Sequence, residues 1–177
     1  MIISVDNIKA HIDCGELSDN IILTRLKAIE QVIRAFTHNN FQNRNARFEA
    51  EASGGVLSGA SPYIRIGDTV QISQSMVNDG LYTVIDITDG QTTVEGDLFA
   101  TKKNLVTKVQ YPDDVVQCAI DLFGWKIEFG DKIGIKSESE ALSRHSESVT
   151  YEDSATLFMG YPVGILKGLA LHSKARF

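Results

Sequence analysis

The chain has 177 residues, of which 43% are hydrophobic and 23% charged, and its formal net charge is −6. This composition is typical of one globular domain or of two small ones, and it excludes a chain that is disordered throughout. An acidic chain without clustered Lys and Arg is also unsuited to general binding of the nucleic-acid backbone.

The sequence predicts a soluble protein that folds in a reducing cytoplasm. No apolar run approaches the roughly 20 residues that span a bilayer, and the start, Met1–Asp6, has neither region of a signal peptide. Cys14 and Cys118 belong to no C-x-x-C pair, so we expect two buried hydrophobic residues and no disulfide.

The first part of the chain has helical spacing. Ser4 is suited to cap a short helix that ends at Cys14 and Gly15, and Ser18 is suited to cap a longer helix over 18–36. We expect the longer helix to stop near Thr37. Its apolar residues recur at spacings of four and three and define one buried face: Ile22, Leu26, Ile29, Ile33 and Phe36.

Residues 47–110 have the two-residue period of β-strands, with turn signals at 78–80 and 89–90. Five short strands are expected, which suggests a small antiparallel barrel or sandwich: 48–52, 64–72, 81–87, 91–95 and 105–109. The Gly- and Ser-rich run 53–61 is expected to be a flexible loop. The few aromatic residues are expected to fill the core rather than to stack on single-stranded nucleic acid: Phe48, Tyr63, Tyr82 and Phe99.

The last part returns to helical spacing after Pro112, which suits the first turn of a helix. The expected apolar face of that helix is Val116, Ala119, Ile120, Phe123 and Ile127. The polar segment 134–142 fits neither a long helix nor a regular strand. A short helix over 162–171 is expected to bury Leu166, Leu169 and Ala170.

The predicted fold class is therefore α+β. Residues 1–46 and 111–177 are expected to form an antiparallel helical core, into which residues 47–110 are inserted as a β-subdomain. The first segment is neutral, whereas 47–110 and 111–177 each carry a net charge of −3.

No catalytic, cofactor-binding or metal-ligating constellation is predicted. The glycine-rich run 53–61 lacks the Lys-Ser/Thr pair of a phosphate-binding loop. His11 and Cys14 could share a helix face, but a zinc site needs two further ligands. Arg144-His145-Ser146 lacks the G-x-S-x-G setting of a serine nucleophile. We therefore expect a protein that is not an enzyme and that holds neither a cofactor nor a metal.

Two groups of segments carry a resemblance to a known family: YPDDVV (111–116) with LFGWK (122–126), and GIKSES (134–139) with RHSESVTY (144–151) and GYP (160–162). They resemble the C-terminal half of the head-tail connector (adaptor, head-completion) family of tailed phages and of prophages in Gram-positive bacteria. The helix over 18–36 resembles that family's N-terminal helix. Region 47–110 departs from the family and resembles an inserted β-domain.

The resemblance implies a structural virion protein, made in the cytoplasm of a bacterial host and located at the head-tail interface. Subunits of that family pack side by side beneath the portal protein as a ring, with twelve-fold symmetry expected in the virion. The ring closes the DNA-filled head, lets DNA pass as cargo, and presents a surface to a stopper or tail-completion protein. No membrane is involved. Segment 134–151 is then a candidate for inter-subunit or channel-lining contacts, and 162–177 a candidate for docking on the portal.

Two other functions fit the same sequence. The chain could be a tail-completion or tail-terminator protein, which is ring-forming but mostly β, whereas the connector hypothesis requires helices at both chain ends. It could also be a small binding module whose β-insert grips a peptide or a sugar.

Overall fold

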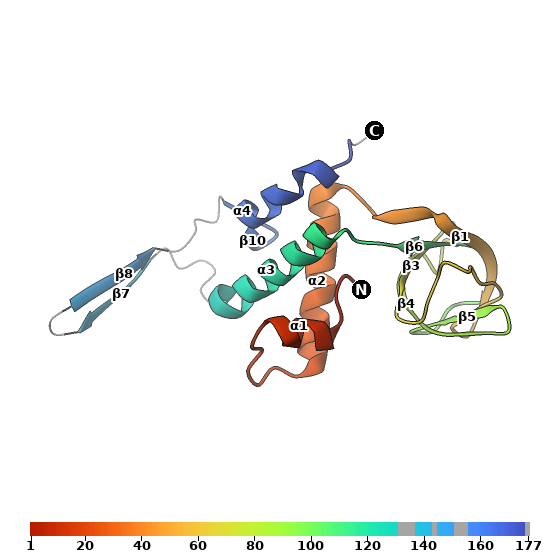
Figure 1. Ribbon diagram of the computed structural model, residues 1–177, viewed down its shortest axis with the longest axis horizontal. Helices are drawn as coiled ribbons and strands as arrows, with labels where there is room; N and C mark the ends of the chain where they lie inside the picture. The colour runs from red at the N-terminus through yellow and green to blue at the C-terminus, as the bar shows by residue number, and fades with distance from the viewer. Residues whose placement is uncertain (131–136, 143–144, 151–155, 176–177) are drawn as a thin grey trace. The chain divides into compact units, whose positions relative to one another are not determined.

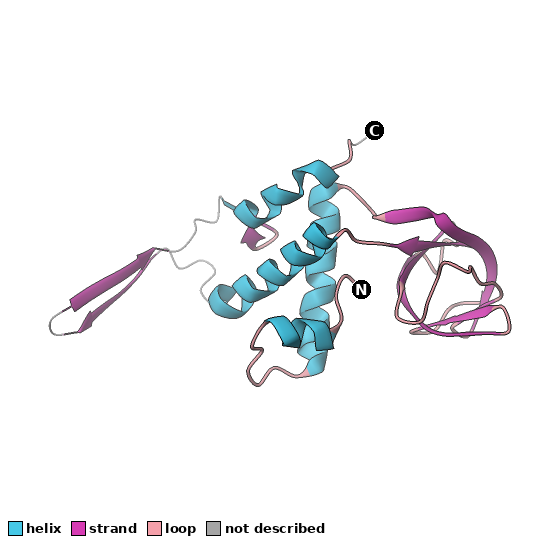
Figure 2. Ribbon diagram, viewed as in Figure 1, coloured by secondary structure: helices cyan, strands magenta, loops and turns pink. Residues whose placement is uncertain are grey.

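The computed structural model describes residues 1–130, 137–142, 145–150 and 156–175 (Figure 1). The fold is mixed α+β, with a closed antiparallel barrel (Figure 2). The chain divides into two compact units: a barrel unit of Met1–Ile2 and Asn40–Pro112, and a helical unit of Ile3–Asn39 and Asp113–Phe177.

The helical unit draws its elements from both ends of the sequence: α1 (Val5–His11), α2 (Asp19–Thr37), α3 (Asp113–Phe129), α4 (Val163–Leu166) and the 3₁₀ helix η3 (Lys167–His172). α3 packs against α2, and α4 and η3 pack against α3. Figure 1 shows α3 crossing α2 obliquely. Two very short strands, β9 (Leu157–Phe158) and β10 (Tyr161–Pro162), pair next to α4.

The N-terminal helices follow the predicted capping. The Ser4 hydroxyl accepts a hydrogen bond from the Asn7 amide at 3.2 Å, and Ser18 occupies the N-cap position of α2. α1 ends at His11, earlier than expected, because the Asp13 carboxylate accepts a hydrogen bond from the Gly15 amide and forms a turn that competes with the helix.

The predicted buried face of α2 is confirmed at four positions, since Ile22, Leu26, Ile29 and Ile33 are fully buried. The fifth, Phe36, is half-buried and packs edge-on against Phe158.

The predicted faces of the two C-terminal helices need correction. Val116 and Ile127 of α3 are only half-buried; its buried residues are Val115, Cys118, Ala119, Ile120, Leu122 and Phe123. This wider face serves contacts on two sides, with α2 and with the C-terminal helices. Leu166 and Leu169 are buried as expected, but Ala170 is exposed, because a 3₁₀ helix repeats every three residues and turns position 170 away from them.

The barrel has six strands: β1 (Gln42–Ser53), β2 (Val56–Leu57), β3 (Thr69–Ser73), β4 (Gly80–Thr88), β5 (Gln91–Val94) and β6 (Thr101–Val109). They close in the order β1-β2-β5-β4-β3-β6, and every pair is antiparallel. Inward-facing aliphatic residues form one core: Ala50, Ala52, Leu57, Ile64, Val70, Ile72, Val84, Val94, Leu98 and Val106. The β4–β5 hairpin turns at Asp89 and Gly90, both with positive φ, as its Asp-Gly sequence predicts.

The glycine-rich run 53–61 is not the flexible loop that was expected. It contains β2, and Leu57 is fully buried. A Cβ atom at Gly59 would lie 2.9 Å from the Phe48 ring, and one at Gly55 would lie 2.8 Å from the Gly96 carbonyl oxygen. These glycines permit close packing of the barrel wall, a role that composition alone does not distinguish from flexibility.

Three further expectations differ from the structure. The strand expected over 64–72 is only β3, because Gly67 adopts a φ of +89° and interrupts it. β1 begins at Gln42, which pairs with Val109, so the units change over at 39–40 and 112–113 instead of at 46–47 and 110–111. In the polar segment, Ser137–Leu142 forms a strand (β7) that pairs with β8 (His145–Thr150). The rest of that segment, 134–136, lies outside the described residues. A two-stranded hairpin needs no apolar face, which explains the missing period.

Candidate functional site

Residue types that carry chemistry are scattered over the two units. Within the part of the chain that the structure describes, no group of three or more His, Cys, Asp or Glu is placed to hold a metal ion. The ring of His11 contacts the Asn7 carbonyl of its own helix at 2.7 Å. His145 lies in β8, and its neighbour Arg144 lies outside the described residues.

Both cysteines are buried and unpaired, as the sequence predicts. Burial raises the pKa of the Cys14 thiol and raises the pKa of Cys118 to about 12. The reactive thiolate form is therefore rare at neutral pH, which disfavours a nucleophilic role. The described helices include none that is long and apolar enough to cross a membrane.

Two of the four barrel aromatics do not fill the core. Phe48 and Tyr82 pack against it, but 65% of Tyr63 and 71% of Phe99 are exposed. Both exposed residues lie on loops, where the strand period carries no information about burial. Phe99 lies at one end of the barrel and Tyr63 at the other.

At one end of the barrel, the side chain of Asn78 joins two loops. Its amide nitrogen donates to the Phe99 carbonyl at 2.9 Å and to Thr101 Oγ1 at 3.0 Å, and its oxygen accepts from the Phe99 amide at 2.9 Å. Asn104 lies beneath it and donates to the Ala50 carbonyl at 3.0 Å. Asn78 and Asn104 are both buried. This network holds loop 74–79 against loop 95–100.

These fixed loops expose three large apolar side chains, Met76, Val77 and Phe99, which we call the tip. Met76 is 93% exposed and has a φ of +69°, a conformation that costs a non-glycine residue about 1–3 kcal/mol. The loop is held in it by hydrogen bonds from the Ser75 amide to the Asp79 carboxylate and from the Asn78 amide to the Ser75 hydroxyl. Strain and apolar exposure at one place are typical of an interaction site.

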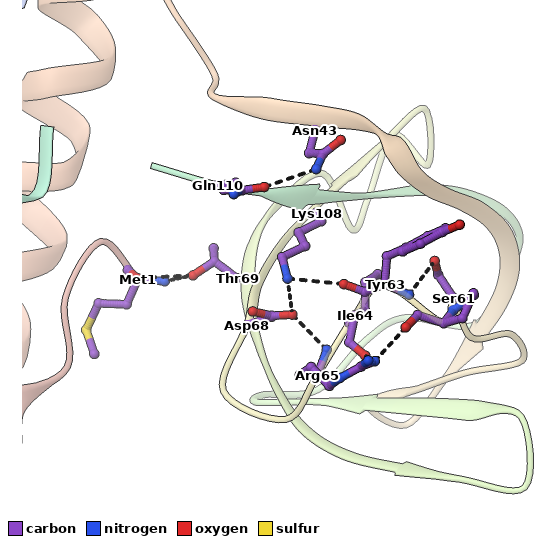
Figure 3. A network of polar contacts seen from close by, with 11 residues as sticks. Met1, Asn43, Ser61, Tyr63, Ile64, Arg65, Asp68, Thr69, Lys108 and Gln110 are labelled. Atoms are coloured by element: carbon purple, nitrogen blue, oxygen red, sulfur yellow. Dashed lines mark hydrogen bonds and ion pairs between the residues drawn. The ribbon is translucent and has the colours of Figure 1, made fainter. Parts of the chain in front are cut away.

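At the other end of the barrel, a second network fixes loop 61–68 (Figure 3). The Asp68 carboxylate accepts from Lys108 Nζ at 2.6 Å and from the Arg65 amide at 2.7 Å. Lys108 Nζ also donates to the Tyr63 carbonyl, and the Arg65 guanidinium donates to the Ile64 carbonyl at 3.1 Å. The Lys108–Asp68 pair is less than a quarter exposed, so solvent screens it only in part.

This loop and the β4–β5 hairpin border a shallow, open and largely apolar depression of about 630 Å³, which we call the groove. Among the residues that line it, Arg65 alone is charged. The lining residues are Ala60, Ser61, Pro62, Ile64, Arg65, Ile66, Ile87 and Gly90. Ile66 is 63% exposed at its edge. Strand periodicity had assigned Ile66 to a strand and so missed this surface.

The C-terminal segment is tied to the ends of two helices. His172 Nε2 lies 2.6 Å from Asp114 Oδ2 at the start of α3. The Asn39 amide group donates to the His172 carbonyl at 3.0 Å, and the Lys174 amide donates to the Thr37 carbonyl at 2.8 Å. The hydrogen bond from His172 lowers the pKa of Asp114. Residues 167–175 are thus ordered on the helical unit, with Lys167 and Lys174 exposed.

The β7–β8 hairpin pairs with no further strand within the described ranges. Its register runs from Ser137 opposite Thr150 to Leu142 opposite His145. Two-stranded hairpins are marginally stable in water, and both outer edges of this one offer backbone groups to another strand.

No protein-family model matches this chain, and no curated protein is significantly similar to it.

Proposed function

We propose that this chain is a non-catalytic structural subunit of a tailed-phage head-tail connector. Made in the host cytoplasm, it assembles as a ring beneath the portal protein of the virion. The ring closes the DNA-filled head, lets DNA pass through its channel, and presents a surface to a stopper or tail-completion protein. The helices from both chain ends, which pack into one unit, form the core of each subunit.

One observation carries the proposal: the barrel exposes large apolar side chains at both ends, on loops that hydrogen bonds fix in place. Exposing Met76, Phe99 and Ile66 to water is unfavourable, and a left-handed Met76 adds strain. A protein whose task is to contact other proteins recovers this cost on assembly. The scattered positions of its His, Cys and acidic residues fit the same role.

The helical unit supports the connector over a tail terminator. A tail terminator is expected to be mostly β. In this chain α2, α3 and the C-terminal helices come from both ends of the sequence and pack into one helical unit, which the connector hypothesis requires. Segments 111–116 and 122–126, one of the two groups on which the resemblance depends, fall at the start and in the middle of α3.

Two segments take the remaining roles. The β7–β8 hairpin, within 134–151, is assigned to contacts with a neighbouring subunit or with the channel, because its unpaired strand edges can accept a further strand. Segment 162–177 is assigned to the portal, since its charged residues, Lys167, Lys174 and Arg176, are all basic.

The test is co-purification with the cognate portal protein, followed by imaging for a ring. Deleting 162–177 would remove the buried Leu166 and Leu169 and confound the result. The better variant is Lys167→Glu with Lys174→Glu, which changes only exposed charge and should weaken portal binding. Lys27→Glu, an exposed site on α2, is the matched control. Portal binding that is equal in all variants would contradict the role of the segment, and the absence of any portal complex would contradict the connector function.

The groove favours one alternative, a binding module that holds a peptide. Its volume is within the range of ligand sites, although its polar lining is sparse. Screening the full chain against extended apolar peptides by NMR would test this function. Shifts confined to Ile64, Ile66 and Ile87 would support it.

A further inference from the structure

We propose that the tip of one copy of this chain inserts into the groove of a second copy. This contact deepens the ring proposed above, and it rests on that function only for its place in the virion.

The two surfaces lie at opposite ends of one strand. β4 begins at Gly80, directly after the tip loop, and ends at Thr88 beside the groove residues Ile87 and Gly90. At about 3.3 Å per residue, the two ends of β4 are roughly 25 Å apart. A contact between two different surfaces of identical subunits is heterologous, so each copy has one tip and one groove to offer. Such a contact closes into a ring when the rotation between copies allows it.

The shapes of the tip and the groove suit a contact between two copies. The tip protrudes, since Met76 is 93% exposed and Phe99 71% exposed. The groove is a shallow, mostly apolar depression. Both loops are fixed in advance by the Asn78 and Lys108 networks, so little loop entropy is lost when they meet.

Charge also points to a second copy. The charged residues of the tip loops 74–79 and 95–100 are all acidic: Asp79, Glu95 and Asp97. The charged residue that lines the groove is basic, Arg65, and its side chain is exposed. Asp86 on β4 and Asp89 in the β4–β5 turn do not line the groove. An acidic protrusion and a hollow with a basic group are electrostatically complementary.

Three apolar side chains make a small contact. It falls short of the area that holds a standard complex together against the entropy cost of association. We therefore expect the chain to be monomeric in dilute solution, and the contact to form at high local concentration, as on a template.

Disulfide trapping in mixed full-length chains tests the contact. One chain carries Met76→Cys and the other Ile66→Cys, and both are oxidised together at high concentration. A heterologous contact predicts roughly tenfold more mixed dimer than either chain forms alone. The matched control is Ile85→Cys in place of Ile66→Cys, since Ile85 is exposed on β4 but does not line the groove. The native cysteines are buried and contribute little background.

Charge reversal provides the second measurement. Asp97→Lys in the tip chain, or Arg65→Glu in the groove chain, should each lower the mixed yield several-fold, and combining the two should restore it. Mixed dimer no more abundant than the two self-dimers, or a yield that charge reversal leaves unchanged, would overturn the contact. If the contact fails while the chain still forms a ring beneath the portal, the proposed function stands without it. Trapping that succeeds without portal binding keeps the contact and removes the connector role.

Discussion

The barrel unit is fixed to a large extent by hydrogen-bonded polar side chains, whereas the helical unit is fixed mainly by aliphatic and aromatic packing. Buried in the barrel are Thr69, Asn78, Thr92, Asn104 and Thr107. Most of their hydrogen bonds reach loops or neighbouring strands, such as Thr92 to the Gly59 carbonyl at 2.8 Å and Arg47 to Thr107 at 3.0 Å. Within the described residues, no buried side-chain nitrogen or oxygen lacks a partner.

The difference follows from the backbone. A helix satisfies its own amide and carbonyl groups, so α2 and α3 need only bury an apolar face. Phe123, Leu26 and Leu122 do so completely. A small barrel has long loops whose backbone groups the strands do not satisfy, and a buried Asn can both satisfy them and select one loop conformation. Both units have an apolar core, but the barrel adds buried polar side chains that fix the conformation of its surface loops.

The largest effect is expected in the helical unit. Phe123→Ala removes the largest fully buried side chain and should lower the free energy of unfolding by about 3–5 kcal/mol. Urea unfolding followed by the helical circular dichroism signal would measure it. The control is Leu171→Ala, because Leu171 is 93% exposed. Similar unfolding midpoints for the two variants would show that the helical unit does not depend on the apolar packing of Phe123.

The next largest effect is expected at the tip. Asn78→Ala leaves both backbone groups of Phe99 without their partner and should cost the barrel about 2–3 kcal/mol. Hydrogen exchange in residues 74–79 and 95–100 should rise with it. Asn43→Ala is the matched control, since Asn43 is partly exposed and its amide donates to the exposed Gln110 side chain. Equal exchange in both variants would show that the loops do not depend on Asn78.

The spacing of apolar residues predicted most of the helices and strands, because the buried residues of both units recur at helix or strand spacing. The spacing of Ile22, Leu26, Ile29 and Ile33 predicted α2, and the turn signals at 78–80 and 89–90 predicted β4. It failed where a local interaction decides the conformation: the Asp13 turn that ends α1, Gly67 in the expected strand, and the close-packed glycines of 53–61.

The tip and the groove could not be predicted from periodicity. Both lie on loops, and their order comes from pairs far apart in sequence, such as Lys108 with Asp68 and Asn78 with Phe99. The residues that do the fixing are polar and inconspicuous in a list of sequence motifs. The residues they expose, Met76 and Ile66, are apolar and would ordinarily be assigned to a core.

A smaller effect is expected at the groove. Lys108→Met removes the partly buried pair with Asp68 and should destabilise loop 61–68 by about 1–2 kcal/mol, with faster hydrogen exchange there. The control is Lys103→Met, because the side chains of the Lys103–Glu49 pair are more than half exposed and lie 3.7 Å apart. Ion pairs of this kind contribute close to nothing to the free energy of unfolding. If both variants left the loop equally protected, the groove would be held by its apolar residues alone.

The smallest effect is expected at the C-terminal segment, where an exposed polar link holds the helical unit. The hydrogen bond from His172 lowers the pKa of Asp114 below its usual value of 3.8. A depressed carboxyl pKa stabilises the folded segment above that usual value, and the contribution is lost as the pH falls through the depressed pKa. Below about pH 3.8 the amide of Lys174, which donates to Thr37, should therefore exchange faster. His172→Ala should return the Asp114 midpoint toward its usual value in an NMR titration, and His11→Ala on α1 should not. If the midpoint stayed depressed without His172, the Val115 amide, which donates to the Asp114 carboxylate at 2.9 Å, would be what lowers the pKa. The polar link would then contribute nothing, and the segment would be held by other contacts, such as the buried Leu166 and Leu169.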